Sequence, residues 1–328
     1  MITGRDVLGE LVSAAGRRTA PPREDYEYVL SAARQAWQRK LRSRRRRGWA
    51  LIITATVMAA SVGGIAFFLW MPRDAVPIVA TTEVVHGNAA IRFPQDAPWR
   101  PLRDGDDVAA GSRLRTGAAA GLALELEGGI SVRLDRQSEL ELASSRAMRL
   151  IAGTVYVDCG PSRFVGGLRV ETHMGTVTDV GTVFEIRSGP DSLRIRVREG
   201  RIQLDASGRS AHFESAAGDE LALGPRGAVL RRDFPATDSA WAWAEALATA
   251  PDVEGRPLVQ FLAWVARETG RRLQFQGPDV EAHAREVVLH GKTRDLAPLQ
   301  ALDLMLSTTD LEYVLAADES IVIRRRED

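Results

Sequence analysis

The stretch GTVTDVGTVFEI, residues 175–186, contains the side chains that could most readily hold a ligand. It has two Gly-Thr pairs six residues apart, with Asp179 between them, and no His, Cys or Lys. Asp179 and the Thr hydroxyls offer too few ligands for a metal ion. Thr and Val favour strands, and Gly permits tight turns, so a β-hairpin or solenoid corner is the alternative to a ligand-holding loop. We expect the hairpin or corner, in which these residues are framework.

Other polar residues give equally little support for catalysis. RDGDD at residues 103–107 could suggest calcium, but it lacks the ligand spacing of a calcium loop and reads better as an Asp-Gly turn. The five histidines form no zinc or Ser-His-Asp pattern, and GxSxG, HExxH and a strand-helix GxGxxG are absent from the sequence. The single cysteine, Cys159, is expected to be a buried, inert thiol, with intermolecular pairing as the minority case. We therefore expect a protein that is not an enzyme and has no cofactor or metal.

Residues 48–71, GWALIITATVMAASVGGIAFFLWM, carry no charge. A helix of this length spans roughly 36 Å, enough for a hydrocarbon core of about 30 Å. Trp49 and Trp70 stand near its ends, where indoles favour the headgroup layer. We expect a transmembrane helix over residues 48–71. A cleaved signal peptide is the rival interpretation, but the apolar run begins late and is longer than a signal core.

The charges predict how this helix is oriented. RKLRSRRRR at residues 39–47 has seven cationic side chains in nine positions, whereas Arg73 is the only cation between the helix and Arg92. The positive-inside rule places the N-terminus in the cytoplasm and the rest of the chain in the periplasm of a bacterial inner membrane. The Arg-rich run abuts the membrane, so we expect it to contact lipid headgroups and not nucleic acid.

Residues 1–47 are expected to form two short helices on the cytoplasmic side, separated by the Pro21-Pro22 break. The second helix carries Val29, Ala33 and Trp37 at helical spacing, followed by Leu41. So short a segment cannot bury a large core. Its apolar stripe is either a seam between the two helices or a surface that binds a cytoplasmic partner.

Between residues 78 and 233 the hydrophobic period changes to two. LALELE, GTVYVD and LRIRVRE alternate apolar and other residues, with Gly or Asp-Gly turns between such runs. The sequence predicts an all-β domain built as a roll, a sandwich or a solenoid. The whole chain is therefore expected to be mainly β, with a smaller α+β part.

Residues 237–328 are expected to form that α+β part. We predict a short helix over SAWAWAEALATA, capped by Thr237 or Asp238, and a second over PLVQFLAWVARETG that ends at Gly270. RRLQFQ, EVVLHG, the helix LAPLQALDLMLSTT, and the hairpin LEYVLA and SIVIRR then follow. Trp241 and Trp243, two residues apart, cannot share one helix face: either one is exposed at the joint between the domains, or both lie in the interdomain core.

Three ordered motifs between residues 102 and 205 resemble the FecR family of membrane-anchored regulators: LRDGDDVAAGSRLRTG, VETHMGTVTDVGTVFEI and VREGRIQLD. The resemblance covers about residues 80–328. The last 75 residues, through GKTRDLAPLQALDLML, also look like the small STN module found after FecR domains and at the front of some outer-membrane receptors. The residues that carry the FecR motifs are Gly105, Arg115, Thr116, Gly117, Gly175, Gly181, Thr182, Phe184, Glu199 and Gly200.

This resemblance implies a periplasmic sensor, a single membrane helix, and a cytoplasmic segment that controls an extracytoplasmic-function sigma factor as an anti-sigma factor. The signal would come from a TonB-dependent outer-membrane receptor or another envelope protein. The segment before the membrane departs from the family, because it is short and holds one tryptophan, Trp37. Since one helix transmits poorly as a rigid rod, we expect the signal to act through proteolysis or oligomerisation.

Two other classes of function remain open on the sequence. The chain could be a structural envelope protein whose STN-like module docks on a receptor or secretin through an exposed strand edge, for which SIVIRR is a candidate. It could also be a periplasmic module that binds a ligand or glycan, because β domains host many sites without a sequence signature.

Overall fold

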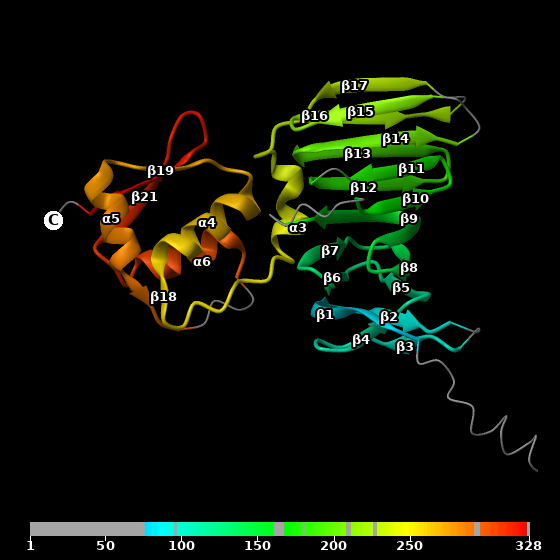
Figure 1. Cartoon of the computed structure of the whole chain (residues 1–328), viewed down its shortest axis with the longest axis horizontal. Helices are drawn as coiled ribbons and strands as arrows, with labels where there is room; N and C mark the ends of the chain where they lie inside the picture. The colour runs from blue at the N-terminus through cyan, green and yellow to red at the C-terminus, as the bar shows by residue number, and fades with distance from the viewer. Residues whose placement is uncertain are drawn as a thin grey trace, which may run out of the picture. The chain divides into compact units, whose positions relative to one another are not determined.

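The computed structural model describes residues 76–94, 97–160, 167–179, 181–207, 211–225, 228–291 and 296–326 (Figure 1). The chain divides into two compact units, Met1–Ala75 and Val76–Asp328, and the described residues all belong to the second. The predicted membrane helix over residues 48–71 and the stripe of Val29, Ala33 and Trp37 lie outside the described residues. In the part that is described, no helix is both long and apolar enough to span a membrane.

Residues 78–233 form two hydrogen-bonded sheets that share the strand β9 (Ala147–Asp158). The first sheet runs in the order β4-β1-β6-β7-β9-β12-β13-β16-β17, and the second in the order β3-β2-β5-β8-β9-β10-β11-β14-β15. Neighbouring strands are antiparallel except β9 and β10. The prediction of a mainly β chain is confirmed.

The other strands of the first sheet are β1 (Ile78–His86), β4 (Asp107–Ala109), β6 (Gly121–Leu126), β7 (Ile130–Leu134), β12 (Val183–Gly189), β13 (Ser192–Glu199), β16 (Asp219–Leu223) and β17 (Val229–Asp233). Those of the second are β2 (Ala89–Arg92), β3 (Arg100–Pro101), β5 (Ser112–Thr116), β8 (Glu139–Ser144), β10 (Arg169–Thr172), β11 (Gly175–Asp179), β14 (Arg201–Ala206) and β15 (His212–Ala216).

The two sheets enclose one hydrophobic core. Alternate residues of each strand point inward, as Leu193, Ile195 and Val197 do from β13, and together with the inward residues of the second sheet they form a single buried cluster. The strand β9 joins the layers because its first half pairs with β8 and β10 and its second half, from Gly153, pairs with β7 and β12. The period-two pattern of the sequence therefore describes the inner side of both layers.

The C-terminal module follows a short 3-10 turn, η2 (Ser239–Trp241), and the helix α3 (Ala242–Glu245). The core of the module lies between its helices and a three-stranded sheet in the order β19-β22-β21, and a separate strand pair is formed by β18 and β20. Its elements are β18 (Arg256–Pro257), α4 (Leu258–Thr269), β19 (Leu273–Phe275), α5 (Pro278–Glu286), β20 (Val288–Leu289), α6 (Pro298–Leu306), β21 (Leu311–Leu315) and β22 (Ile321–Arg325).

Two helices of this module, α4 and α5, differ in how clearly the sequence marks their ends and their buried side. The helix α4 ends where predicted, because Gly270 adopts a left-handed conformation with φ 64° and its N–H closes the last turn. The helix α5 was missed, since only Val280 and Ala284 of its residues are buried and the apolar pattern is weak. Its signals are at the ends: Pro278 in the first turn with two acidic residues, and basic residues in the last.

Two glycines with the same φ angle allow a test of whether a close contact requires glycine. Gly200 and Gly105 both have φ 81°, but a Cβ at Gly200 would lie 2.5 Å from the Gly181 carbonyl oxygen, whereas none of the described atoms lies within 4 Å of one at Gly105. Gly105→Ala should cost about 1–2 kcal/mol of unfolding free energy from the left-handed conformation alone. Gly200→Ala should cost clearly more, measured by urea unfolding; equal losses would contradict the close contact.

Candidate functional site

The outer side of the first sheet carries a row of large polar side chains. Cross-strand pairs join Arg133 to Tyr156, Tyr156 to Glu185, Glu185 to Arg196, and Arg196 to Glu220. All five residues are buried. Strands that alternate apolar and charged residues usually expose the charged side, so the burial of this row means that something covers it.

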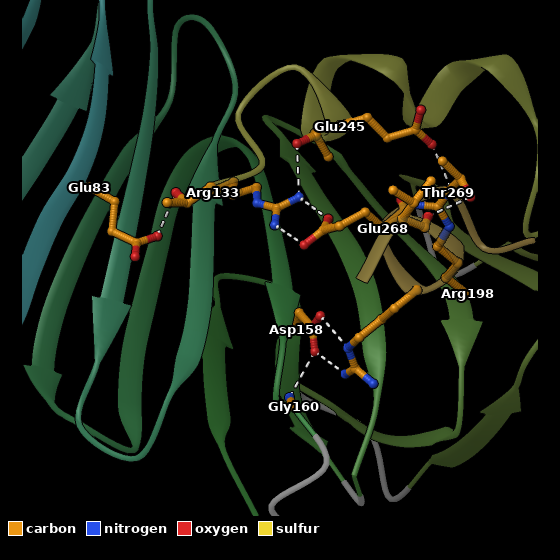
Figure 2. A network of polar contacts seen from close by, with 12 residues as sticks. Glu83, Arg133, Asp158, Gly160, Arg198, Glu245, Glu268 and Thr269 are labelled. Carbon is orange, nitrogen blue, oxygen red and sulfur yellow. Dashed lines mark hydrogen bonds and ion pairs between the residues drawn. The ribbon is translucent and has the colours of Figure 1, made fainter. Parts of the chain in front are cut away.

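Arg133 is the most deeply buried cation of the row. Its Nη1 and Nη2 atoms each donate a 2.8 Å hydrogen bond to one carboxylate oxygen of Glu268 in α4, and Nη1 also donates to the Ala244 carbonyl at 2.9 Å (Figure 2). Its guanidinium lies 5.0 Å from the ring centroid of Tyr156. Burial alone would lower the pKa of Arg133, but the Glu268 carboxylate outweighs it and the net pKa is raised. Arg133 therefore stays charged.

Arg198 in β13 binds the C-terminal module mainly through backbone carbonyls. Its Nη1 donates to the Glu268 carbonyl at 2.6 Å, its Nε to the Ala236 carbonyl at 2.7 Å, and its Nη2 to the Glu245 carboxylate at 2.6 Å. The guanidinium also lies 5.0 Å from the ring centroid of Trp241. A cation at the last turn of α4 is favoured by the helix dipole, so Arg198 both caps the helix and fixes its place.

A third ion pair lies beside these two. Arg267 in α4 donates from Nε to Asp158 at 2.9 Å and from Nη2 to the other oxygen of the same carboxylate, and its Nη1 lies 3.7 Å from Glu199 (Figure 2). Hydrogen bonding to Asp158 raises the pKa of Arg267. Asp158 also accepts the Gly160 N–H at 2.7 Å. Two consecutive residues of α4, Arg267 and Glu268, thus bind opposite charges on the same sheet.

The apolar part of this junction is a small aromatic cluster. Tyr156, Val183, Phe234, Trp241 and Ala244 form a buried cluster of their own. Trp241 is fully buried and Trp243 is half-buried, and both rings meet Tyr156 edge to face, with centroids 6.0 and 6.4 Å away. Both tryptophans therefore lie in the interdomain core, one of the two arrangements that the sequence allowed.

The remaining charges of the row are neutralised by neighbours. Trp243 donates its indole N–H to Glu185 at 2.9 Å, and Arg194 and Arg196 lie 3.1 and 3.5 Å from the other oxygen. Glu220 accepts from Arg196 at 2.6 Å and from Arg232 at 2.7 Å. Burial would raise the pKa of Glu220, but these hydrogen bonds outweigh it and lower the pKa.

Paired charges of this kind hold two surfaces together. Across the described ranges no group of three or more His, Cys, Asp and Glu is placed to hold a metal ion. Tyr156 has a raised pKa, first because it is buried and then because of Glu268, so its hydroxyl stays neutral. The junction is suited to docking and to release, and we take it as the candidate functional site.

The motif residues of the FecR resemblance lie mostly in the framework of the sheets. Gly105 forms an Asp-Gly turn whose N–H donates to the Thr82 carbonyl at 2.8 Å. Thr116 is buried and donates to the Asp135 carbonyl at 2.5 Å, and the Gly117 N–H donates to the Asn88 carbonyl at 2.9 Å. Arg115, in contrast, is exposed on the outer side of the second sheet.

The motif residues of the opening stretch come closer together. Gly200 packs against the Gly181 carbonyl, and Thr182 donates to the Arg201 carbonyl at 2.7 Å. The stretch is a corner between the two sheets and not a hairpin, because β11 pairs with β10 and β14 whereas β12 pairs with β9 and β13. Phe184 is buried in the core. The remaining two face neighbouring strands or the module: Gly175 lies against the Asp205 carbonyl, and Glu199 lies near Arg267.

The residues of the junction were not found from the sequence. LRIRVRE places Arg194, Arg196 and Arg198 on an outward side, which by itself predicts exposure, but Arg196 and Arg198 are buried. What the sequence lacks is any local sign that α3 and α4 cover this side. The two tryptophans of SAWAW were the only signal, because aromatic residues just after an all-β domain favour a packed joint.

Comparison with known proteins agrees with the motif resemblance over part of the chain. Residues 112–203 match the family model described as FecR protein. This FecR match runs from the first residue of β5 into β14, and so contains Arg133, Asp158 and Arg198 but not the C-terminal module.

Two crystal structures of a putative anti-sigma factor from Parabacteroides distasonis ATCC 8503 were also found, each with 15% identity and a TM-score of 0.36. They cover 66% of this chain and 99% of their own. A TM-score this low does not establish a shared fold. The curated proteins contain no match to this chain.

Removing the Glu268 carboxylate should weaken the junction. In Glu268→Gln the amide can replace one hydrogen bond but not the charge, so Arg133 stays buried and unpaired, at a cost of about 3–5 kcal/mol. We expect earlier thermal unfolding and faster hydrogen exchange in α4 and β7. Glu312→Gln is the matched control, because its pair with Arg324 at 2.8 Å is partly exposed and should contribute less than about 1 kcal/mol. Equal losses of stability in the two variants would argue against a special contribution of the Arg133–Glu268 ion pair.

Glu83, an acid near the junction, should make the free energy of unfolding depend on pH. Glu83 in β1 accepts a 2.8 Å hydrogen bond from Thr249, and its pKa is raised, first by burial and also by the nearby Glu125. It borders a cavity of about 790 Å³ between β1 and residues 246–253.

Because the folded form binds the Glu83 proton more tightly than the unfolded chain, its contribution is present below the ordinary pKa of 4.5 and is lost as pH rises through the higher folded pKa. Glu83→Gln should therefore gain stability relative to the wild type between pH 4.5 and neutral pH, as measured by urea midpoints. Wild-type and variant profiles that stay parallel would refute this assignment.

Proposed function

We propose that this chain is a membrane-anchored signalling regulator of the FecR type. In this proposal residues 48–71 cross the bacterial inner membrane, residues 1–47 lie in the cytoplasm, and the part from Val76 onward lies in the periplasm. The FecR match over residues 112–203 is the observation that carries the proposal. The uncharged run of residues 48–71, preceded by seven cations in nine positions, supports the topology.

The cytoplasmic partner in this proposal is an extracytoplasmic-function sigma factor. It would bind the stripe formed by Val29, Ala33 and Trp37, since so short a segment needs a partner to bury its apolar residues. A tryptophan in such a stripe is the kind of residue that dominates binding energy at interfaces. The chain would then act as an anti-sigma factor or sigma-factor regulator, without being an enzyme.

The periplasmic partner would be a TonB-dependent outer-membrane receptor or another envelope protein, acting on the STN-like C-terminal module. The junction supports this step, because α4 carries both Arg267 and Glu268, so any partner that shifts this helix must break two ion pairs at once. Release would expose the charged side of the first sheet. Proteolysis or oligomerisation of the opened form would then pass the signal to the cytoplasmic segment.

A structural docking protein is the second candidate, and one observation favours it. The strand β21 is an edge of the three-stranded sheet and exposes Val314 and Leu315. The strand SIVIRR, which was expected to supply such an edge, is instead β22 and lies between β19 and β21. A partner strand would therefore have to pair with β21 or β19.

Capture of the sigma factor from the organism's own lysate tests the leading proposal. Detergent-solubilised full-length protein should retain one sigma factor, identified by mass spectrometry. Trp37→Ala should reduce retention at least tenfold, if Trp37 contributes the roughly 2 kcal/mol typical of a binding hot spot. Tyr28→Ala is the matched control, since Tyr28 points about 100° away from Val29 on a helix. Retention of no sigma factor by the wild type would favour the docking candidate.

A further inference from the structure

A partly exposed cluster of two arginines and one indole lies on the outer side of the second sheet. The guanidinium carbons of Arg115 in β5 and Arg92 in β2 lie 4.2 and 5.2 Å from the ring centroid of Trp99. Arg92 and Arg115 come from neighbouring strands, because Ala90 in β2 pairs with Arg115. Arg100 in β3, 4.5 Å from the ring centroid of Phe93, pairs with the inward-facing Ile91 and therefore lies on the other side of the sheet.

These arginines differ from the others on the same side of the sheet. Arg113 lies 2.9 Å from Glu141 and Arg149 lies 3.1 Å from Glu171, so each is neutralised by a cross-strand carboxylate. In the described part of the chain, Arg92 and Arg115 have no carboxylate partner, although Glu139 stands directly opposite Arg115. Stacking on a ring holds a guanidinium plane in place while its N–H edges stay free to bind an anion.

The cluster lies at the end of the domain where the described chain begins. The Ala110 N–H donates to the Pro77 carbonyl at 2.8 Å, and a Cβ at the next residue, Gly111, would lie 3.1 Å from Pro94. Pro77 is therefore close to the segments that carry Arg92 and Arg113. Residues 72–77 separate this point from the proposed membrane helix, and six residues span at most about 20 Å.

The first residues of the domain are apolar and exposed. Val76 and Ile78 are 45% and 47% exposed, among the most exposed large apolar side chains of the described residues. Exposed apolar residues, an indole and unpaired arginines at one end of a domain match the layers of a bilayer surface. Indoles favour the headgroup region, and guanidinium groups bind phosphates in a bidentate manner.

We propose that this cluster, formed by Arg92, Arg115 and Trp99, binds the anionic phospholipid headgroups of the membrane in which the chain is anchored. The inference rests on the proposed function for the position of the anchor. It goes further, because it gives the periplasmic domain a second contact with the bilayer, beside its tether. Asp104 and Asp106 in the nearby turn oppose this charge only in part, since both accept backbone N–H groups, of Val85 and Arg103.

Binding to lipid vesicles tests the inference on the compact unit from Val76 to Asp328, whose hydrophobic clusters lie entirely within it. The probe is vesicles of phosphatidylethanolamine with 30% phosphatidylglycerol, compared by co-sedimentation with vesicles of phosphatidylcholine. We expect binding that rises with phosphatidylglycerol content and weakens as salt is raised. The double variant Arg92→Gln, Arg115→Gln should bind more than tenfold more weakly, since each cation near an anionic surface contributes about fivefold. Trp99→Ala should also weaken it.

The matched control is the double variant Arg169→Gln, Arg187→Gln, which removes the same charge from exposed positions on β10 and β12. It should change vesicle binding by less than about twofold, because it lies several strands away. No preference for anionic vesicles, or equal losses in the two double variants, would overturn the inference. Reporter fusions after residues 47 and 76 of the full chain test the proposed anchor separately, so failure of the topology is distinguishable from failure of the lipid contact.

Discussion

The buried ion pair between Arg133 and Glu268 is the constraint on which the arrangement of this molecule depends. Both charges have left water, and each satisfies the other through two parallel hydrogen bonds. Such a pair adds little net stability compared with apolar packing, but removing one partner is costly. Burial of Arg133 therefore makes every arrangement unfavourable in free energy if the group that covers Arg133 is not a carboxylate. Arg198 and Arg267 lie on either side of this pair, and their hydrogen bonds also hold α4 against the first sheet.

This constraint explains why the first sheet differs from the second. Its inner side is apolar and faces the core, while its outer side is polar and yet buried under α3 and α4 (Figure 1, Figure 2). The outer side of the second sheet carries a similar alternation of Arg and Glu, but there the pairs are partly exposed. The same strand chemistry thus serves as solvent-facing surface on one layer and as an interface on the other.

The mainly β character of the chain was predictable from the sequence, because the period-two pattern and the glycine turns act locally. The end of α4 at Gly270 was predictable for the same reason. The helix α5 was missed because only Val280 and Ala284 anchor it. Arg133, Arg198 and Glu268 could not be predicted as a site, since Arg133 and Glu268 lie 135 positions apart and no local pattern links them. The motif glycines and Thr182 lie in strands or in the connections between them.

That separation along the chain has a consequence for the order of folding. Every strand of the two sheets is complete by Asp233, before the residues that cover the outer side of the first sheet. Chains emerge from their N-terminus at about 5–20 residues per second, so the sheets can assemble while Glu268 has yet to appear. For that interval Arg133 and Arg198 face solvent and remain hydrated. Docking of α4 is then a late desolvation step, and a chain truncated after Asp233 would remain permanently in the uncovered state.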